Sequence, residues 1–216
     1  MTEAAVAVLA AEASRRRLTV RQAAVVEQLV DAAADEARVE GYEGLTVRNV
    51  ARRAGVAPAT AYTYFASKDH LLAEVLWRRF QALPVPNAGD RDGADRARHG
   101  GDGDDSVEAD RRADRVIAEL RALGLFVADD PTLAAACTTA LLGSGPEVRA
   151  LRVLFGTALH DRLARALGED ADAAVLRSLD LAYSGAMLWA GMGHIRFEDV
   201  PDALADAARL VLGGSA

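Results

Sequence analysis

The stretch Gly44–Leu72, GLTVRNVARRAGVAPATAYTYFASKDHLL, decides the fold because it marks two short helices joined by a tight turn. Thr46 is a good N-cap for the first helix. Gly55 marks its end, since glycine tolerates the left-handed conformation of a turn. Pro58 suits the first position of a second short helix, and Ser67 caps a third. This order of helix-starting and helix-ending residues predicts a helix–turn–helix.

Three segments of this stretch carry a family resemblance: Gly44–Arg48 (GLTVR), Ala54–Val56 (AGV) and Thr60–Leu72 (TAYTYFASKDHLL). With them the chain resembles the TetR family of bacterial transcriptional repressors, over residues from about 22 to 80. The resemblance implies a homodimer that binds a palindromic operator and is released by a small effector. In one departure, Ala57 opens the recognition helix where many relatives have serine.

Composition narrows the class of protein. Hydrophobic residues make up 51% of the 216 residues but aromatic residues only 5%, and the prevalence of alanine and leucine favours helices over strands. Apolar runs long enough to span a membrane are missing from the sequence. The single cysteine, Cys137, excludes an internal disulfide and suits a reducing cytosol. We therefore expect a soluble cytoplasmic protein.

The net charge of −7 does not argue against a nucleic-acid partner, because the acidic residues are unevenly distributed. Residues 1–80 have a net charge of +1, whereas residues 81–216 have a net charge of −8. The helix–turn–helix stretch itself contains three arginines and the only lysine of the chain, Lys68. Local basic charge is what attracts a phosphate backbone.

The chain divides into an arm and two domains. Residues 1–18 are expected to form a flexible arm whose Arg15–Arg17 either reaches the DNA or is simply solvated. Residues 19–66 are assigned to the helix–turn–helix DNA-binding domain. Residues 67–216 are assigned to a helical regulatory and dimerisation domain, interrupted by a disordered acidic, glycine-rich loop at 84–106.

Apolar residues recur at helical spacing through the rest of the chain. They predict further helices that begin after Thr19, Ser67, Asp130, Gly145 and Asp199 and that cover Val107–Leu123 and Asp170–Met192. Gly41, Gly143, Gly168 and Gly213 mark expected helix ends. The total is about nine helices in an all-α fold, which matches what the family resemblance implies.

The second helix of a helix–turn–helix meets base edges with its first residues. Here these are Ala57, Pro58, Ala59 and Thr60, which offer methyl groups and one hydroxyl. Arg48 in the preceding helix is therefore the best candidate for a guanine contact. By resemblance, Arg48 and Thr60 fall where family members touch bases.

Other side chains are expected to contact the DNA backbone. By resemblance, Tyr62, Tyr64 and Lys68 fall where family members grip phosphates, and Thr46 falls where a helix N-terminus meets the backbone. Phenol hydroxyls and an ammonium position a protein without reading sequence. Phe65 is expected to be core, whereas Tyr62 and Tyr64, which alternate with it, are both expected to face out.

The C-terminal helices resemble the dimerisation and ligand-binding part of the family. Residues 170–192 and 201–212 are expected to pair with their copies in a four-helix bundle. A shortage of buried charge favours a hydrophobic effector such as a fatty acyl thioester, a sterol or an aromatic compound. Candidate ligand-binding residues, most of which could equally be ordinary core, are Trp77, Phe80, Leu120, Leu123, Phe126, Phe155, Leu159, Tyr183, Met187 and Trp189.

Catalysis, a cofactor and a metal site are not expected. His160 and His194 lack the spacing of metal ligands, and Cys137 has no basic neighbour in sequence that would activate it. Two alternatives stay open. One is a helical enzyme or small-molecule-binding protein in which the helix–turn–helix is structural. The other is a regulator that acts through protein partners, with the acidic loop as the docking segment.

Overall fold

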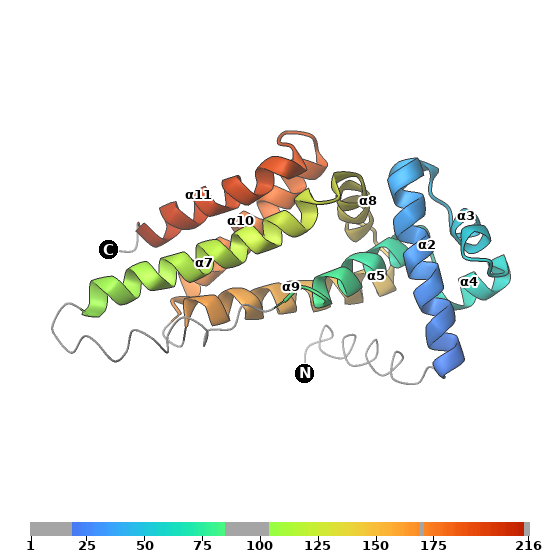
Figure 1. The fold of residues 1–216 in the computed structure, drawn as a ribbon, viewed down its shortest axis with the longest axis horizontal. Helices are drawn as coiled ribbons and strands as arrows, with labels where there is room; N and C mark the ends of the chain where they lie inside the picture. Colours follow the sequence, from blue (N-terminus) through green and yellow to red (C-terminus); the bar gives the residue numbers. More distant parts are fainter. Residues whose placement is uncertain (1–18, 85–103, 169–170, 214–216) are drawn as a thin grey trace. The chain divides into compact units, whose positions relative to one another are not determined.

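A computed structural model describes residues 19–84, 104–168 and 171–213 (Figure 1). Within these ranges the chain forms nine α-helices and one 3-10 helix and contains no strand, so the all-α prediction is confirmed. The predicted arm at 1–18 and most of the predicted loop at 84–106 lie outside the described residues. The elements are α2 Val20–Gly44, α3 Val47–Arg53, α4 Pro58–Tyr64, α5 Lys68–Gln81, α7 Asp104–Ala128, α8 Pro131–Leu141, α9 Pro146–Leu167, α10 Ala173–Gly191, η1 Phe197–Asp199 and α11 Val200–Gly213.

The chain folds as two compact units. Unit 1 contains the described residues up to Ala82 together with Asp130–Thr157, and unit 2 contains those of Leu83–Asp129 and of Ala158 onward. Unit 1 thus combines α2–α5 with α8 and the first part of α9. The domain boundary expected at residue 66 stays a prediction, since unit 1 extends beyond it.

Helix starts follow the capping residues seen in the sequence. Thr19 forms a capping box with Gln22, in which each residue's side chain accepts from the other's backbone N–H, at 3.3 and 2.9 Å. The side chains of Thr46, Ser67 and Asp130 accept hydrogen bonds from the third residue of α3, α5 and α8. These caps confirm the predicted starts of four helices.

Two glycines with positive φ shape the approach to the helix–turn–helix. Gly41, with φ of 64°, interrupts α2 at the residue where the helix was predicted to end, and a short helical turn follows it. Gly55, with φ of 68°, makes the turn between α3 and α4. A side chain would strain either position.

The core of unit 1 lies between α2 and the helices packed on it. Leu29 and Ala33 of α2, Val50 of α3, and Leu71 and Leu72 of α5 have no exposed surface. α8 packs on both α2 and α5. The long helix α2 is therefore the scaffold for the other helices of the unit.

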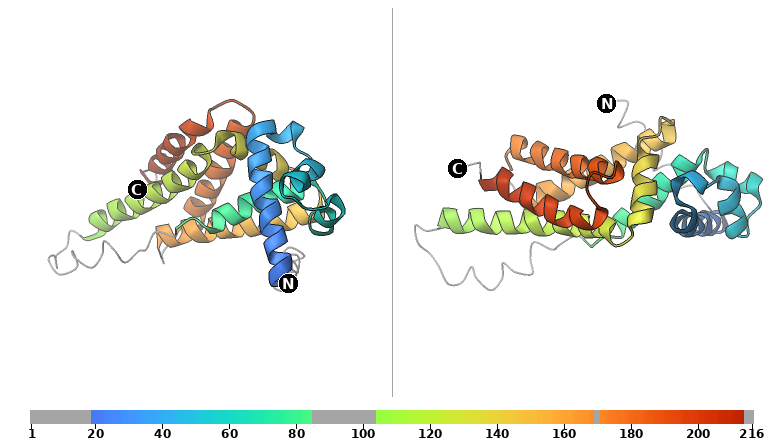
Figure 2. Two further views of the ribbon diagram at one scale, coloured as in Figure 1. Left: turned by 45° about the vertical axis from the view of Figure 1, so that its right-hand side comes forward. Right: turned by 90° about the horizontal axis from the view of Figure 1, so that it is seen from above.

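In unit 2, α11 packs along α7 and α10 (Figure 2). Gly124 of α7 lets the two backbones approach closely, because a Cβ there would lie 2.7 Å from Cα of Pro201. Several boundaries differ from the sequence prediction. α7 ends at Ala128, after Leu123, and α10 spans Ala173–Gly191 where 170–192 was expected. α7 begins at Asp104, before Val107, and η1 precedes α11 without having been predicted.

Candidate nucleic-acid interface

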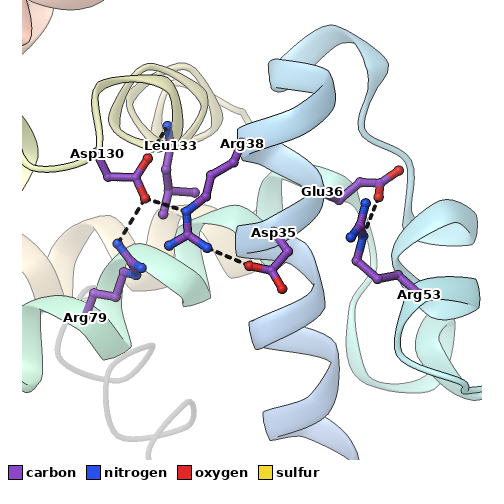
Figure 3. A network of polar contacts seen from close by, with 7 residues as sticks. All are labelled: Asp35, Glu36, Arg38, Arg53, Arg79, Asp130 and Leu133. Carbon is purple, nitrogen blue, oxygen red and sulfur yellow. Dashed lines mark hydrogen bonds and ion pairs between the residues drawn. The ribbon is translucent and has the colours of Figure 1, made fainter.

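Ion pairs on opposite sides of α2 hold the helix–turn–helix in place (Figure 3). On one side, the buried carboxylate of Glu36 accepts from Nε of Arg53 in α3, at 2.7 Å. On the other, Nε of Arg38 donates to Asp130 at 2.7 Å, and Arg79 of α5 lies 3.6 Å from the same carboxylate. α2 is thereby tied to α3 by one carboxylate and to α8 and α5 by another.

A second set of contacts joins the end of α2 to the start of α5. The Tyr42 hydroxyl donates to Asp69 at 2.7 Å, and burial, with the Asp69 carboxylate beside it, raises the pKa of Tyr42 to about 12. Nζ of Lys68 donates to the Tyr42 carbonyl at 2.8 Å and lies 3.9 Å from the centroid of its ring. This corner fixes the entry into the helix–turn–helix.

The three arginines of α3 differ in what they contact. Nε of Arg53 is paired with Glu36, and Arg52 donates to the side chain of Asn49 at 3.1 Å. Arg48 is exposed and makes no hydrogen bond or ion pair with any residue in the described ranges. Of the three, Arg48 is therefore the guanidinium that is free to meet a base edge.

The first turn of α4 presents small apolar groups. Ala57, Pro58 and Ala59 are exposed, and Thr60 is half-buried. Ala57 is the N-cap of α4, and its methyl group cannot accept the capping hydrogen bond that a serine hydroxyl could accept. The face offers methyl and methylene groups, as the sequence indicated.

The aromatic residues of α4 divide by exposure. Tyr62 is 55% exposed and Phe65 is 3% exposed, which agrees with one outward and one core position. Tyr64 is half-buried and does not stand out from the surface as Tyr62 does. Contacts from either tyrosine to phosphate stay a prediction.

Lys68 and Thr46 occupy helix starts and already bind protein groups. The half-buried Lys68 gives one of its three N–H donors to the Tyr42 carbonyl. Thr46 is exposed and accepts from the backbone N–H of Asn49 at 3.1 Å. Both stay candidates for phosphate contact, Lys68 with two remaining donors.

Two residues of this face were missed by sequence reasoning. Asn49 holds the side chain of Arg52, and Thr63 is exposed on α4 with its hydroxyl bonded to the Ala59 carbonyl at 3.1 Å. Helical spacing could have found Thr63, since it lies one turn after Ala59.

The ten candidate ligand-binding residues divide between the two units. In unit 1, the ring of Phe80 lies 6.3 Å from Trp77 and 4.5 Å from Phe155, measured between centroids. In unit 2, the buried candidates are Leu120, Leu123, Leu159 and Tyr183. Phe126 and Met187 are half-buried, and Trp189 is 57% exposed. The exposed indole is a surface group and not an interior one.

The expected shortage of buried charge in this region is wrong. Glu119 of α7 and Arg162 of α9 form an ion pair inside unit 2, and both are buried. Arg162 also donates to the carbonyls of Leu83 and Pro84, at 3.3 and 2.8 Å. Burial raises the pKa of the Tyr183 phenol, and the nearby Arg162 opposes that shift. Over the residues described, the interior of unit 2 is therefore apolar except for the buried ion pair of Glu119 and Arg162.

The exposed large apolar side chains of the neighbouring helices α10 and α11 in unit 2 are together termed the α10–α11 face. Its large side chains are Leu181, Leu188, Trp189 and Met192 on or directly after α10, and Leu210 on α11. Gly185 has open space where a Cβ would lie. Such a face on neighbouring helices indicates an interaction surface.

Other reactive side chains give no sign of chemistry. Cys137 of α8 is buried, and that burial raises the pKa of its thiol to about 12. His160 lies 2.7 Å from Asp180, as a pair between α9 and α10. The described ranges hold no group of three or more potential metal ligands, and none of their helices is long and apolar enough to cross a bilayer.

The fold and the α3–α4 face define a helix–turn–helix transcriptional regulator. The model of the family described as bacterial regulatory proteins, tetR family, matches residues 29–75. An uncharacterized HTH-type transcriptional regulator of Mycobacterium tuberculosis is 39% identical over 197 residues, which is 90% of this chain and 84% of that protein. The chain belongs to the TetR family.

Further comparisons agree with this assignment. The repressor KstR of Rhodococcus jostii is 44% identical over 57 residues, 26% of this chain and 27% of that protein. A TetR regulator from Rhodococcus sp. has the same fold, with a TM-score of 0.67 and 21% identity over 91% of this chain and 100% of that chain. Thermus thermophilus FadR, crystallised with lauroyl-CoA, gives a TM-score of 0.60 and 20% identity over 88% and 95% of the two chains.

Proposed function

We propose that this TetR-family regulator is a homodimeric repressor that reads a palindromic operator through α3 and α4. The proposal rests on which arginines of the α3–α4 face are already bonded to other residues. Arg48 is exposed and makes no ion pair among the described residues, whereas the neighbouring Arg52 and Arg53 are bonded within the unit. An unpaired guanidinium beside a methyl-lined helix suits a major groove.

The dimer is proposed to form through residues 170–192 and 201–212. The exposed apolar side chains of α10 and α11 support this, because a second copy would cover them by two-fold symmetry. Two copies also supply two reading heads for two half-sites, which one short helix cannot do alone. Trp189, with more than half its surface exposed, belongs to this face in the proposal.

Operator binding by matched arginine variants tests the proposal. Fluorescence anisotropy would be measured on DNA from upstream of the protein's own gene and on random duplex, at several salt concentrations. Arg48→Ala is expected to weaken operator binding by about 1–3 kcal/mol and to relax sequence preference. Arg52→Ala removes another exposed arginine of α3 and is expected to weaken operator and random duplex equally. Equal effects of the two variants on specificity would contradict the role of Arg48.

The effector is proposed to be a small hydrophobic molecule, of which a fatty acyl thioester is the first to test. Support comes from the buried apolar side chains of α7, α9 and α10 and from the likeness in fold to a repressor crystallised with lauroyl-CoA. Lauroyl-CoA is expected to raise the midpoint of thermal unfolding and to release operator DNA. Coenzyme A without the acyl chain is the matched control. Release by both, or by neither, would count against an acyl effector.

A further inference from the structure

The outward ridge of α4 consists of Ala59 and Thr63. Ala61 is fully buried, and at 3.6 residues per turn the positions two before and two after it lie on the opposite side of the helix. Both ridge residues are exposed, as this geometry requires. They are one turn apart, so their side chains lie side by side on the surface.

The chemistry of this ridge is apolar in spite of the threonine. The hydroxyl of Thr63 donates to the carbonyl of Ala59 at 3.1 Å, so its proton is used within the helix. The γ-methyl of Thr63 is then the group left to face away from the helix. Two methyl groups, one from each residue, make up the ridge.

The residues that precede the ridge add no strong hydrogen-bonding group. Ala57 and Pro58 are exposed and carry only hydrocarbon side chains. In the major groove, thymine alone among the four bases presents an apolar group, its 5-methyl. A polar base edge against the methyl of Ala59 or of Thr63 would lose water without gaining a partner, which is unfavourable.

We propose that Ala59 and Thr63 read thymine methyl groups, so that each operator half-site is recognised through thymine on the α4 side. The inference rests on the proposed function, in which α4 enters the major groove. It adds Thr63 as a specificity-determining residue. Together with a guanine contact from Arg48, it defines the class of half-site as one that combines guanine with thymine.

Removal of single methyl groups from the DNA tests the inference. The full chain would first select its preferred duplex from a random library. Each thymine would then be replaced in turn by deoxyuridine, which differs only by lacking the 5-methyl group. At the positions facing the ridge, each replacement is expected to weaken binding about fourfold, the value of one buried methyl. Replacement in both half-sites is expected to weaken it about sixteenfold.

Two variants of Thr63 assign the effect to its methyl group. Thr63→Ser keeps the hydroxyl and removes the methyl, so the preference for thymine over deoxyuridine is expected to disappear at the position it faces. Thr63→Val keeps a methyl and removes the hydroxyl, so the preference is expected to persist. Circular dichroism and the thermal midpoint show whether each variant folds. The measurement on the wild-type chain needs no variant at all.

The outcomes separate this inference from the function on which it rests. A wild-type protein that selects a duplex but binds thymine and deoxyuridine equally at every position overturns the methyl readout and leaves the repressor proposal standing. A preference that survives Thr63→Ser and disappears in Thr63→Val overturns the role given to the methyl. Absence of binding to any duplex overturns both.

Discussion

The α3–α4 face of unit 1 and the α10–α11 face of unit 2 offer partners opposite chemistry. The first presents an arginine, a tyrosine hydroxyl and small methyl groups, and the second presents leucines, a tryptophan and a methionine. The first can stay in water when unoccupied, because its groups are charged, polar or small. The second exposes five large apolar side chains, whose burial by a partner would be favourable.

The support beneath the two faces differs as well. In unit 1, Glu36 pairs with Arg53, whose side chain is 40% exposed. In unit 2, Glu119 pairs with Arg162, and the two side chains are 3% and 5% exposed. Water screens the first pair and is excluded from the second, so the two ties should respond very differently to loss of a carboxylate.

The largest effect is expected from breaking the buried pair. Glu119→Ala leaves the Arg162 guanidinium buried without its carboxylate and opens a cavity. The free energy of unfolding should fall by about 3 kcal/mol or more, measured by urea denaturation. The double variant Glu119→Leu/Arg162→Met removes both charges and should recover part of that loss. It also removes the donors to Leu83 and Pro84, so full recovery is not expected. If the double variant is no more stable than Glu119→Ala, the loss of stability does not come from the unpaired charge of Arg162.

The apolar face of unit 2 is tested by placing a charge on it. Trp189→Asp should weaken the proposed dimer by about 2 kcal/mol, or about thirtyfold, as read by sedimentation equilibrium. Operator binding should weaken with it, since both half-sites are needed. Leu125→Asp is the matched control, because Leu125 is 53% exposed and belongs to α7, outside the proposed dimer helices. Equal dissociation by both variants would contradict the assignment of the interface.

The partly exposed pair of unit 1 should matter less. Glu36→Gln is expected to lower the free energy of unfolding by about 1 kcal/mol, because Arg53 keeps water as a partner. It also frees Arg53 on the DNA side of α2, so the salt dependence of binding to random DNA should become steeper. Asp35→Asn, at an exposed neighbouring ion pair with Arg38, should change stability by less than about 0.5 kcal/mol. If Glu36→Gln and Asp35→Asn lower the free energy of unfolding equally, the packing of α3 on α2 does not depend on Glu36.

The difference between the two units also explains how far sequence reasoning could go. In unit 1, Thr46, Gly55, Pro58 and Ser67 act on neighbours within a few residues, so local rules predicted the starts of α3, α4 and α5. In unit 2 the decisive contact joins Glu119 to Arg162, which are far apart in the chain. Apolar spacing predicts that a helix is buried, but it does not say which charge on that helix meets a charge on another.

The candidate site shows the same limit on a smaller scale. The core position of Phe65 was predicted from its alternation with the tyrosines, and Arg48 was chosen because the first residues of α4 have no bidentate side chain. The bonding of Arg52 to Asn49, and of Lys68 to the Tyr42 carbonyl, depends on rotamers and on the turn at Gly41. Which basic side chain is free could be read only from the folded structure.

The smallest effect is expected from placing a serine at the start of α4. In Ala57→Ser the new hydroxyl can accept from the backbone N–H of Thr60, which already bonds the Ala57 carbonyl at 2.9 Å. The gain in the free energy of unfolding should therefore be about 0.5 kcal/mol, at the low end for an N-cap. Ala59→Ser places the same hydroxyl on the methyl ridge, inside the helix, and should instead cost about 0.5 kcal/mol. Thermal unfolding compares the two. A gain from both would show that a hydroxyl on α4 stabilises it irrespective of position, and the capping explanation would fail.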